Sequence, residues 1–134
     1  MTVNPYLHFK GNCAEAIAFY EKSFGVKAKD VAKFSDIPQG EGYKAEPGTE
    51  NYITHACLPL GEGEHSIFMS DWLEAEKGRN ISISVAFSSM DEAKKAFDKL
   101  AAGGEVEEPL SRTFWAEAWG SLTDKFGIMW QVTV

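Results

Sequence analysis

The sequence predicts an α+β fold made of two tandem βαβββ modules. Three observations support this: two helix-start signals of the same kind, a strand-like run before each of them, and three strand-like runs after each of them. The chain has 134 residues, a length that suits a single domain. We therefore expect one domain over 1–134, with modules at about 1–75 and 79–134.

The first helix is expected over about residues 13–24. Asn12 and Glu15 have the spacing of a capping box, in which each side chain bonds a backbone amide at the other residue. Gly25 stands where a left-handed residue commonly ends a helix. Apolar residues at helical spacing form one face, namely Ala16, Ile17, Phe19, Tyr20 and Phe24.

A second helix repeats the pattern. Ser89 and Glu92 give the same start signal, and Gly103 with Gly104 marks the end. The apolar face consists of Ala93, Ala96, Phe97 and Leu100. Glu15 and Glu92 occupy equivalent places in the two helices, which indicates a weak internal repeat.

Strand-like runs surround both helices. The runs Tyr6–Phe9 and 81–85 precede them. The runs that follow are at about 28–34, 51–59 and 65–70 in the first module, and at about 105–108, 114–123 and 128–133 in the second. Turn residues at 61–64 and 124–127 predict hairpins, and the glycines and prolines within 36–49 predict a mobile loop.

Alternation within the strands of the second module separates two faces. Side chains two residues apart share a face, so Asn80, Ser82 and Ser84 are expected on the side away from the helix, together with Met129, Gln131 and Thr133. The opposite face, toward the helix, is expected to hold Ile81, Ile83, Val85, Ile128, Trp130 and Val132.

Composition excludes several classes of function. Thirteen basic residues against twenty acidic ones give a formal charge of −7, which opposes nucleic-acid binding. The sequence has neither a basic leader nor an apolar run of about 20 residues, so we expect a cytoplasmic protein without a membrane partner. Cys13 and Cys57 lack metal or redox spacing and are expected to be buried thiols, although the adjacent helix start can lower the pKa of Cys13.

Several spaced motifs together resemble one family. They are Tyr6-Leu7-x-Phe9-x-Gly11-Asn12-Cys13-x-Glu15-Ala16-x-x-Phe19-Tyr20, Phe24-Gly25, His55, Phe68-Met69-Ser70-Asp71, and Gly120-Ser121-Leu122-Thr123-Asp124-x-Phe126-Gly127-x-x-Trp130. The chain resembles the vicinal oxygen chelate superfamily of glyoxalase and bleomycin-resistance proteins, and its PhnB-like branch. The resemblance implies a cup-shaped sheet with helices on the convex side, a ligand site inside the cup, and a homodimer.

The resemblance also implies where metal-dependent relatives hold a divalent ion. Those positions fall on Pro5, Phe68, Asn80 and Gln131. Proline and phenylalanine carry no donor atom, and amide oxygens bind transition metals poorly compared with imidazole or carboxylate. We therefore expect no metal at the standard site and no cofactor, which argues against metal-dependent glyoxalase or dioxygenase chemistry.

A pocket for a small, neutral, partly polar ligand remains possible inside the cup. The candidate ligand-binding residues are Phe68, Asn80, Ser82, Gln131, Trp119 and His55. The simpler interpretation is that the serines are merely solvated on an exposed strand face. Glu117 is a weak candidate for a catalytic acid or base, provided that burial raises its pKa; an exposed structural glutamate is the alternative.

Two functions follow from these expectations. The first is a PhnB-like protein that binds a small organic molecule without the standard metal, with catalysis left open. The alternative is a metal-dependent lyase or dioxygenase that uses a displaced ligand set such as His55, Asp71 and Glu117, with His8 and His65 as further candidates. For Asp71, capping of a turn is the default role, and a third possibility is an interaction protein whose cup is vestigial.

Overall fold

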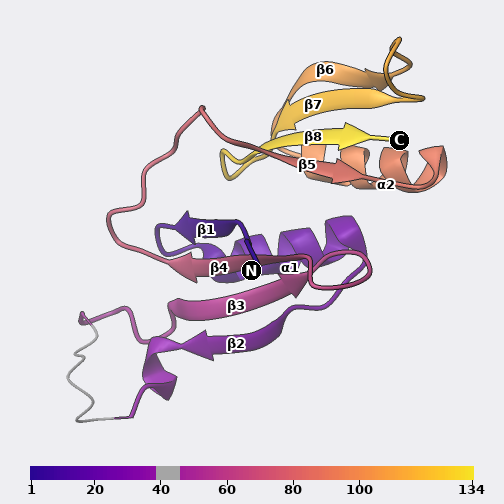
Figure 1. Cartoon of the computed structure of the whole chain (residues 1–134). Coiled ribbons are helices and arrows are strands. Elements are labelled where there is room, and N and C mark those ends of the chain that lie inside the picture. The colour runs from indigo at the N-terminus through magenta and orange to yellow at the C-terminus, as the bar shows by residue number, and fades with distance from the viewer. Residues whose placement is uncertain (39–45) are drawn as a thin grey trace. The chain divides into compact units, whose positions relative to one another are not determined.

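The first module contains one four-stranded sheet and one long helix. The computed structural model describes residues 1–38 and 46–134, which form the compact units Met1–Glu76 and Lys77–Val134. The elements of the first unit are β1 (Tyr6–Phe9), α1 (Cys13–Phe24), β2 (Lys29–Lys33), the 3-10 helix η1 (Phe34–Asp36), β3 (Ile53–Pro59) and β4 (Ser66–Asp71) (Figure 1). Part of the loop predicted at 36–49 lies outside the described residues.

The second module repeats this order. Its elements are β5 (Ser82–Ala86), α2 (Met90–Ala101), β6 (Glu105–Ser111), β7 (Trp119–Thr123) and β8 (Met129–Thr133). The strand orders β1-β4-β3-β2 and β5-β8-β7-β6 correspond, and in each sheet the first and last strands of the module are parallel neighbours. The predicted α+β fold with two βαβββ modules is confirmed.

One predicted strand starts later than expected. The run predicted at 114–123 is a strand only from Trp119. The segment before it forms a turn that is held by hydrogen bonds between Thr113 and Ala116. The Thr113 hydroxyl accepts the Ala116 amide at 3.1 Å, and the Thr113 amide donates to the Ala116 carbonyl at 3.3 Å. Strand β6 in turn extends to Ser111, beyond its predicted end at 108.

Helix α1 contacts β3 and β4 through its buried face, which includes Ile17 and Tyr20. Gly25 ends the helix with φ 68°, as predicted. The capping box predicted at the other end is wrong, because the Asn12 side chain makes no capping bond. The carboxylate of Asp71 takes that place: Oδ1 accepts the backbone N–H groups of Gly11 at 2.9 Å and Cys13 at 3.0 Å.

The second carboxylate oxygen of Asp71 serves another strand. Oδ2 accepts the backbone N–H of Ile53, the first residue of β3, at 2.9 Å. Asp71 itself ends β4 and is buried. One side chain therefore connects the start of α1, the start of β3 and the end of β4, which is more than the turn capping expected of it.

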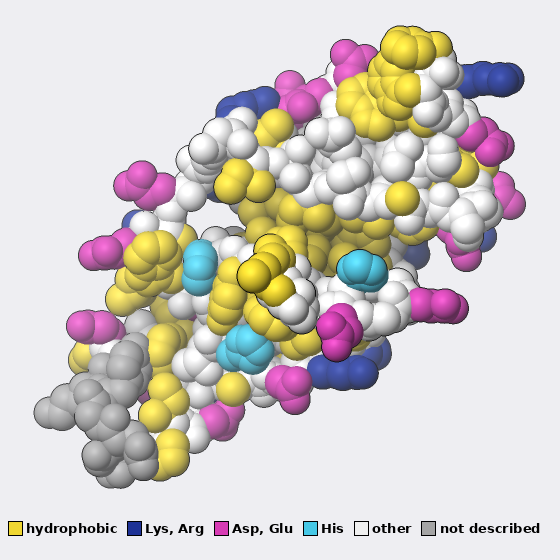
Figure 2. All heavy atoms as spheres, in the orientation of Figure 1, with side chains coloured by type: hydrophobic (Ala, Val, Ile, Leu, Met, Phe, Trp, Pro, Cys, Tyr) yellow, Lys and Arg dark blue, Asp and Glu magenta, His cyan; other side chains and the backbone are white. Residues whose placement is uncertain are grey.

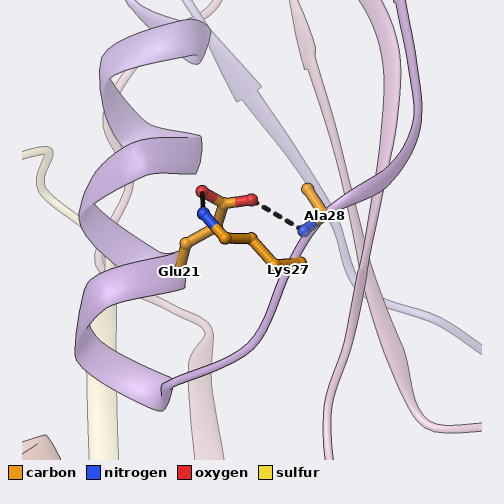
Figure 3. Close-up of polar contacts among 3 residues, drawn as sticks. All are labelled: Glu21, Lys27 and Ala28. Carbon is orange, nitrogen blue, oxygen red and sulfur yellow. Dashed lines mark hydrogen bonds and ion pairs between the residues drawn. The ribbon is translucent and has the colours of Figure 1, made fainter.

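Glu21, near the end of α1, contacts Lys27 and Ala28 in the segment that follows the helix (Figure 3). The Glu21 carboxylate accepts the backbone N–H of Ala28 at 2.8 Å and pairs with Lys27 Nζ at 3.2 Å. The Ala28 N–H, assisted by Lys27, holds the pKa of Glu21 below its ordinary value. This contact fixes the approach of the chain to β2.

The core of the second module lies between α2 and its sheet. Helix α2 contacts β6, β7 and β8, and Ser89 caps it by accepting the Glu92 amide at 3.2 Å, as predicted. Trp130 is fully buried and its indole N–H donates to the Asp124 carboxylate at 2.8 Å. At Gly120 a Cβ would lie 2.8 Å from the Leu110 backbone and 2.9 Å from the Phe97 ring, so glycine allows the close approach of the β6 backbone.

Charge is dispersed on the face of the molecule that Figure 2 shows. Figure 2 shows acidic side chains spread across the visible surface with basic ones among them. Across 1–38 and 46–134, the structure contains no helix of the length and apolar character needed to cross a bilayer.

The environment of Cys13 contradicts the expected lowering of its pKa. The side chain is fully buried, and this burial, followed by the negative charge of Asp71, raises the pKa of the Cys13 thiol from 9.0 to about 12. Cys57 is half-buried rather than buried, and both thiols are free. Cys13 is therefore a protonated core residue at neutral pH and not a nucleophile.

Replacing Asp71 with Asn is expected to lower the free energy of unfolding by about 2 kcal/mol. An asparagine oxygen can still accept two amides, but its NH₂ group would face the Ile53 N–H and leave that buried donor unpaired. Urea denaturation measures the loss. Asp36→Asn is the matched control, because Asp36 is exposed and accepts one amide, from Lys33, at 2.8 Å. Equal stability of the two variants would contradict the role given to Asp71.

The raised pKa of Cys13 predicts a loss of stability at alkaline pH. The thiol binds its proton more tightly in the folded chain, so its contribution is full below pH 9.0 and disappears as pH rises toward about 12. In that range it should remove roughly 1 kcal/mol of unfolding free energy per pH unit. Urea denaturation at several pH values should give a shallower decline for Cys13→Ala than for the Cys57→Ala control. Parallel declines would refute the assignment.

Candidate functional site

A hydrogen-bonded row crosses three strands of the second sheet. The indole N–H of Trp119 on β7 donates to Gln131 Oε1 on β8 at 3.2 Å, and Gln131 Nε2 donates to the Ser82 hydroxyl on β5 at 2.9 Å. All three side chains are half-buried. The structure thus brings three of the predicted ligand-binding residues together. We call Trp119, Gln131 and Ser82 the polar row.

Strand alternation places the polar row on the face away from α2, which we call the helix-free face of this sheet. On β8, Trp130 and Val132 are fully buried toward α2, whereas Met129, Gln131 and Thr133 are half-buried on the other side. Ser121 lies opposite Gln131 in the β7–β8 ladder. The faces predicted for this strand are confirmed.

The same alternation does not extend to the residues before β5. The strand begins at Ser82, so Asn80 and Ile81 lie outside the ladder. Ile81 is 77% exposed, and the prediction that it packs toward the helix is wrong. Asn80 is exposed and takes no part in the polar row. The strand starts one residue later than the predicted run 81–85, so neither Asn80 nor Ile81 follows the alternation of the sheet.

An ion pair lies near the polar row and was missed by the sequence analysis. Arg79 Nη2 contacts Glu107 Oε1 at 2.7 Å, and the Thr123 hydroxyl donates to the same oxygen at 3.0 Å. The ladder shifts register between Val106 and Glu108, which leaves Glu107 without a ladder partner there. No alternation pattern reveals such a shift. The pair cancels the charge of Glu107 at this end of the helix-free face.

The first sheet carries an aromatic cluster of Tyr6, His8, His55 and Phe68. The Tyr6 hydroxyl and His55 Nδ1 are 3.1 Å apart and hydrogen-bonded, and the Tyr6 ring stacks on His8 with centroids 4.8 Å apart. Phe68 lies edge-on to Tyr6 and His55, at centroid distances of 5.8 and 5.2 Å. His55 and Phe68 were predicted as site residues; Tyr6 was not.

Register explains why these rings meet. Tyr6 pairs with Phe68 and His8 with Ser70 in the β1–β4 ladder, while Cys57 pairs with Phe68 in the β3–β4 ladder. His55 shares the face of Cys57 by alternation. The neighbouring residues of β4, Met69 and Asp71, are buried on the α1 side. The aromatic cluster therefore lies on the helix-free face of the first sheet, and the spacing of Tyr6 and His8 was the available signal.

Two residues of the displaced metal set are placed unfavourably for metal binding. Both oxygens of Asp71 accept backbone amides on the α1 side of β4, whereas His55 lies on the helix-free face. Within 1–38 and 46–134, no three His, Cys, Asp or Glu side chains are grouped to hold a metal.

The side chains at the four standard positions are poor ligands for a divalent ion. The backbone carbonyl of Pro5 accepts the Phe68 amide at 2.9 Å, and neither side chain carries a metal-binding atom. Gln131 Oε1 accepts the Trp119 indole and its Nε2 faces Ser82. Asn80, the fourth of these positions, is exposed. The residues at the four positions therefore do not fit the metal that the family resemblance associates with them.

Glu117 is exposed and precedes β7 rather than lying on it. Its backbone N–H donates to the Val134 carbonyl at 3.1 Å, so the local pairing is structural. The burial that a catalytic role would require is absent. This placement fits an exposed structural glutamate, which was the alternative to a catalytic acid or base.

A cavity of about 410 Å³ opens in the first module, away from most of the predicted site residues. Its lining combines aromatic rings with three acidic side chains, and one of these, Asp71, is the only lining residue among the predicted candidates. The lining residues are Phe34, Glu46, Thr49, Tyr52, Asp71, Trp72, Leu73 and Glu74. They come from separate segments with no shared spacing, so no sequence pattern indicates this cavity.

Known proteins resemble the chain over its whole length. Protein YjdN of Escherichia coli K12 is 34% identical over 144 residues, covering 100% of this chain and 95% of that protein. The solved structure of PA1353 from Pseudomonas aeruginosa has 34% identity and a TM-score of 0.85, covering 99% and 96% of the two chains. A PhnB protein from Bacillus cereus has 25% identity and a TM-score of 0.77, covering 99% and 98%.

A family model extends the comparison to the predicted family. The model of the Glyoxalase/Bleomycin resistance protein/Dioxygenase superfamily matches residues 2–132. The matched segment includes both modules, the polar row and the aromatic cluster. The chain therefore belongs to this superfamily and is PhnB-like, as its motifs predicted.

Proposed function

We propose that this chain binds a small organic molecule on the helix-free face of its second sheet, without a divalent metal at the standard positions of the family. The observation that carries the proposal is the polar row. Gln131 occupies one of those positions, and its amide is engaged by Trp119 and Ser82 at hydrogen-bond distance. Half-buried polar groups of this kind orient a small ligand.

The aromatic cluster of the first module, taken by itself, is a second candidate surface for a small organic molecule. Tyr6 is 41% exposed, and with Phe68 and His55 it offers flat apolar surface beside a hydroxyl and an imidazole. Such a surface suits a ligand with a planar or apolar part. His8 and His55 also bring imidazole nitrogens to this surface, so the proposal leaves room for catalysis without a metal.

The alternative is a metal-dependent lyase or dioxygenase of the glyoxalase type. Its displaced ligand set would need His55, Asp71 and Glu117 to meet at one ion. The Asp71 carboxylate would first have to give up three buried amide bonds, and Glu117 would have to leave its exposed position. Metal-free binding is the proposal that requires no such rearrangement.

We also propose that the two modules act as one domain and that the chain forms a homodimer. The support for association is an exposed aromatic pair: Phe114 is 96% and Trp115 is 59% exposed, with ring centroids 4.7 Å apart. Large exposed aromatic side chains are typical of protein interfaces.

Thermal melts with a panel of metabolites and antibiotics test ligand binding. At least one compound should raise the melting temperature in a dose-dependent way, by several degrees when it is present at about 100 times its Kd. EDTA should leave the shift unchanged. Gln131→Leu should reduce the shift, whereas Ser88→Ala, at an exposed position after β5, should retain it.

Two outcomes would contradict this proposal. Flat melting curves across the panel would remove small-molecule binding. Elemental analysis that finds about one metal ion per chain, together with loss of the shift in EDTA, would favour the metal-dependent alternative. Substitution of His55 and Glu117 would then have to abolish metal binding.

The dimer is tested by light scattering during size-exclusion chromatography. The expected mass is twice the 14.8 kDa of one chain. Phe114→Ser with Trp115→Ser should shift the protein toward the monomer if the aromatic pair is in the interface. A wild-type mass of one chain at every concentration tested would refute the dimer.

A further inference from the structure

The polar row has a fixed hydrogen-bond direction, and this direction specifies the ligand. We infer that the helix-free face of the second module takes a molecule that carries no negative charge and has a hydrogen-bond-accepting oxygen, such as a ketone carbonyl, next to a flat apolar group. The Ser82 hydroxyl and the Gln131 amide donate to that oxygen. Trp119 is the positioning residue, because its indole N–H sets the direction of the hydrogen bonds in the row. The inference rests on the proposed function and adds the class of ligand to it.

The direction follows from the chemistry of the indole. A tryptophan Nε1–H group donates a hydrogen bond and accepts none. The atom of Gln131 that lies 3.2 Å from it must therefore be the amide oxygen. This settles the orientation of the amide, which is otherwise ambiguous between two flipped states. The Nε2 group consequently points to Ser82.

The next bond is fixed in the same way. Gln131 Nε2 donates, so the Ser82 oxygen accepts at 2.9 Å and its own proton remains for another partner. Within residues 77–134 the structure provides no protein acceptor for the Ser82 hydroxyl. The second hydrogen of Gln131 Nε2 is likewise not used in the row. Two donor groups on neighbouring strands are therefore left for an acceptor.

The surroundings of the polar row limit the rest of the ligand. The Trp115 ring lies edge-on to Trp119 with centroids 5.8 Å apart, which gives an aromatic surface at the β7 end. At the other end Met129 pairs with both Ser82 and Thr123, and Thr123 contacts the Glu107–Arg79 pair. That pair is neutralised internally, whereas Glu105 and Glu108, opposite Thr123 and Ser121 in the β6–β7 ladder, leave negative charge on this side of the sheet, which disfavours an anionic ligand.

Acetophenone and isopropenylbenzene form an isosteric pair of probes, since a C=O group in the first replaces a C=CH₂ group in the second. Both are titrated into ¹⁵N-labelled full-length protein, and the indole N–H of Trp119 and the side-chain amide of Gln131 are followed by NMR. Acetophenone should bind roughly two- to tenfold more tightly, which corresponds to one neutral hydrogen bond. It should shift both signals saturably.

Two variants separate the roles of the donors. Ser82→Ala should abolish the preference for acetophenone, and Ser88→Ala is the control that should keep it. Trp119→Phe keeps an aromatic ring but removes the indole donor, so the Gln131 amide is released to flip and the preference should shrink although Ser82 is intact. A purely structural role for Trp119 would change both affinities and leave their ratio unchanged. Backbone amide spectra show whether each variant is folded.

The outcomes distinguish this inference from the proposed function. Equal affinity for the two probes, or a preference that survives in Ser82→Ala, would overturn the inference while binding at the face stands. No shift of any second-module signal with either probe would overturn the inference and, with it, the proposed site on this face.

Discussion

The first module depends on the carboxylate of Asp71. Its three amide bonds lie between segments that are far apart in the sequence: Gly11 and Cys13 at the start of α1, and Ile53 at the start of β3. A buried charge is costly unless it is hydrogen-bonded, and here every bond is to a backbone donor that would otherwise be unpaired. The position of α1 on the sheet, and hence the separation of the two faces, follows from this contact. The same charge contributes to the high pKa of Cys13.

The second module reaches the same topology with a different anchor. Its buried carboxylate is Asp124, which accepts the Phe126 and Ile128 amides within the β7–β8 turn and the indole of Trp130 from β8. Helix α2 instead starts on its own Ser89 cap. The internal repeat thus conserves strand order and helix position, while the polar contacts that fix them differ between the modules. This difference is consistent with a repeat that is weak in sequence.

The fold was largely predictable because it is determined by local patterns. Helical spacing, Gly25, Ser89 and strand alternation each report on their own segment, and they agree with one another. Long-range contacts were not predictable: nothing near Asp71 in the sequence indicates that it caps α1, and nothing near Glu107 indicates the shift in register. The placement of the candidate site residues was predicted in part for the same reason. Alternation identified Ser82, Gln131 and Trp119, but failed at Asn80, where the strand had not yet begun, and at Glu117, where a turn intervenes.

Alternation on β4 has a consequence for how such a protein diversifies. Ile67, Met69 and Asp71 hold the core and α1, whereas Ser66, Phe68 and Ser70, on the other side of the same strand, do not. Strand β8 is divided in the same manner by Trp130 and Gln131. Substitutions on the helix-free side can therefore change the surface of the sheet while the residues between them keep the core. One short strand serves two separate purposes, the stability of the module and the chemistry of its helix-free surface.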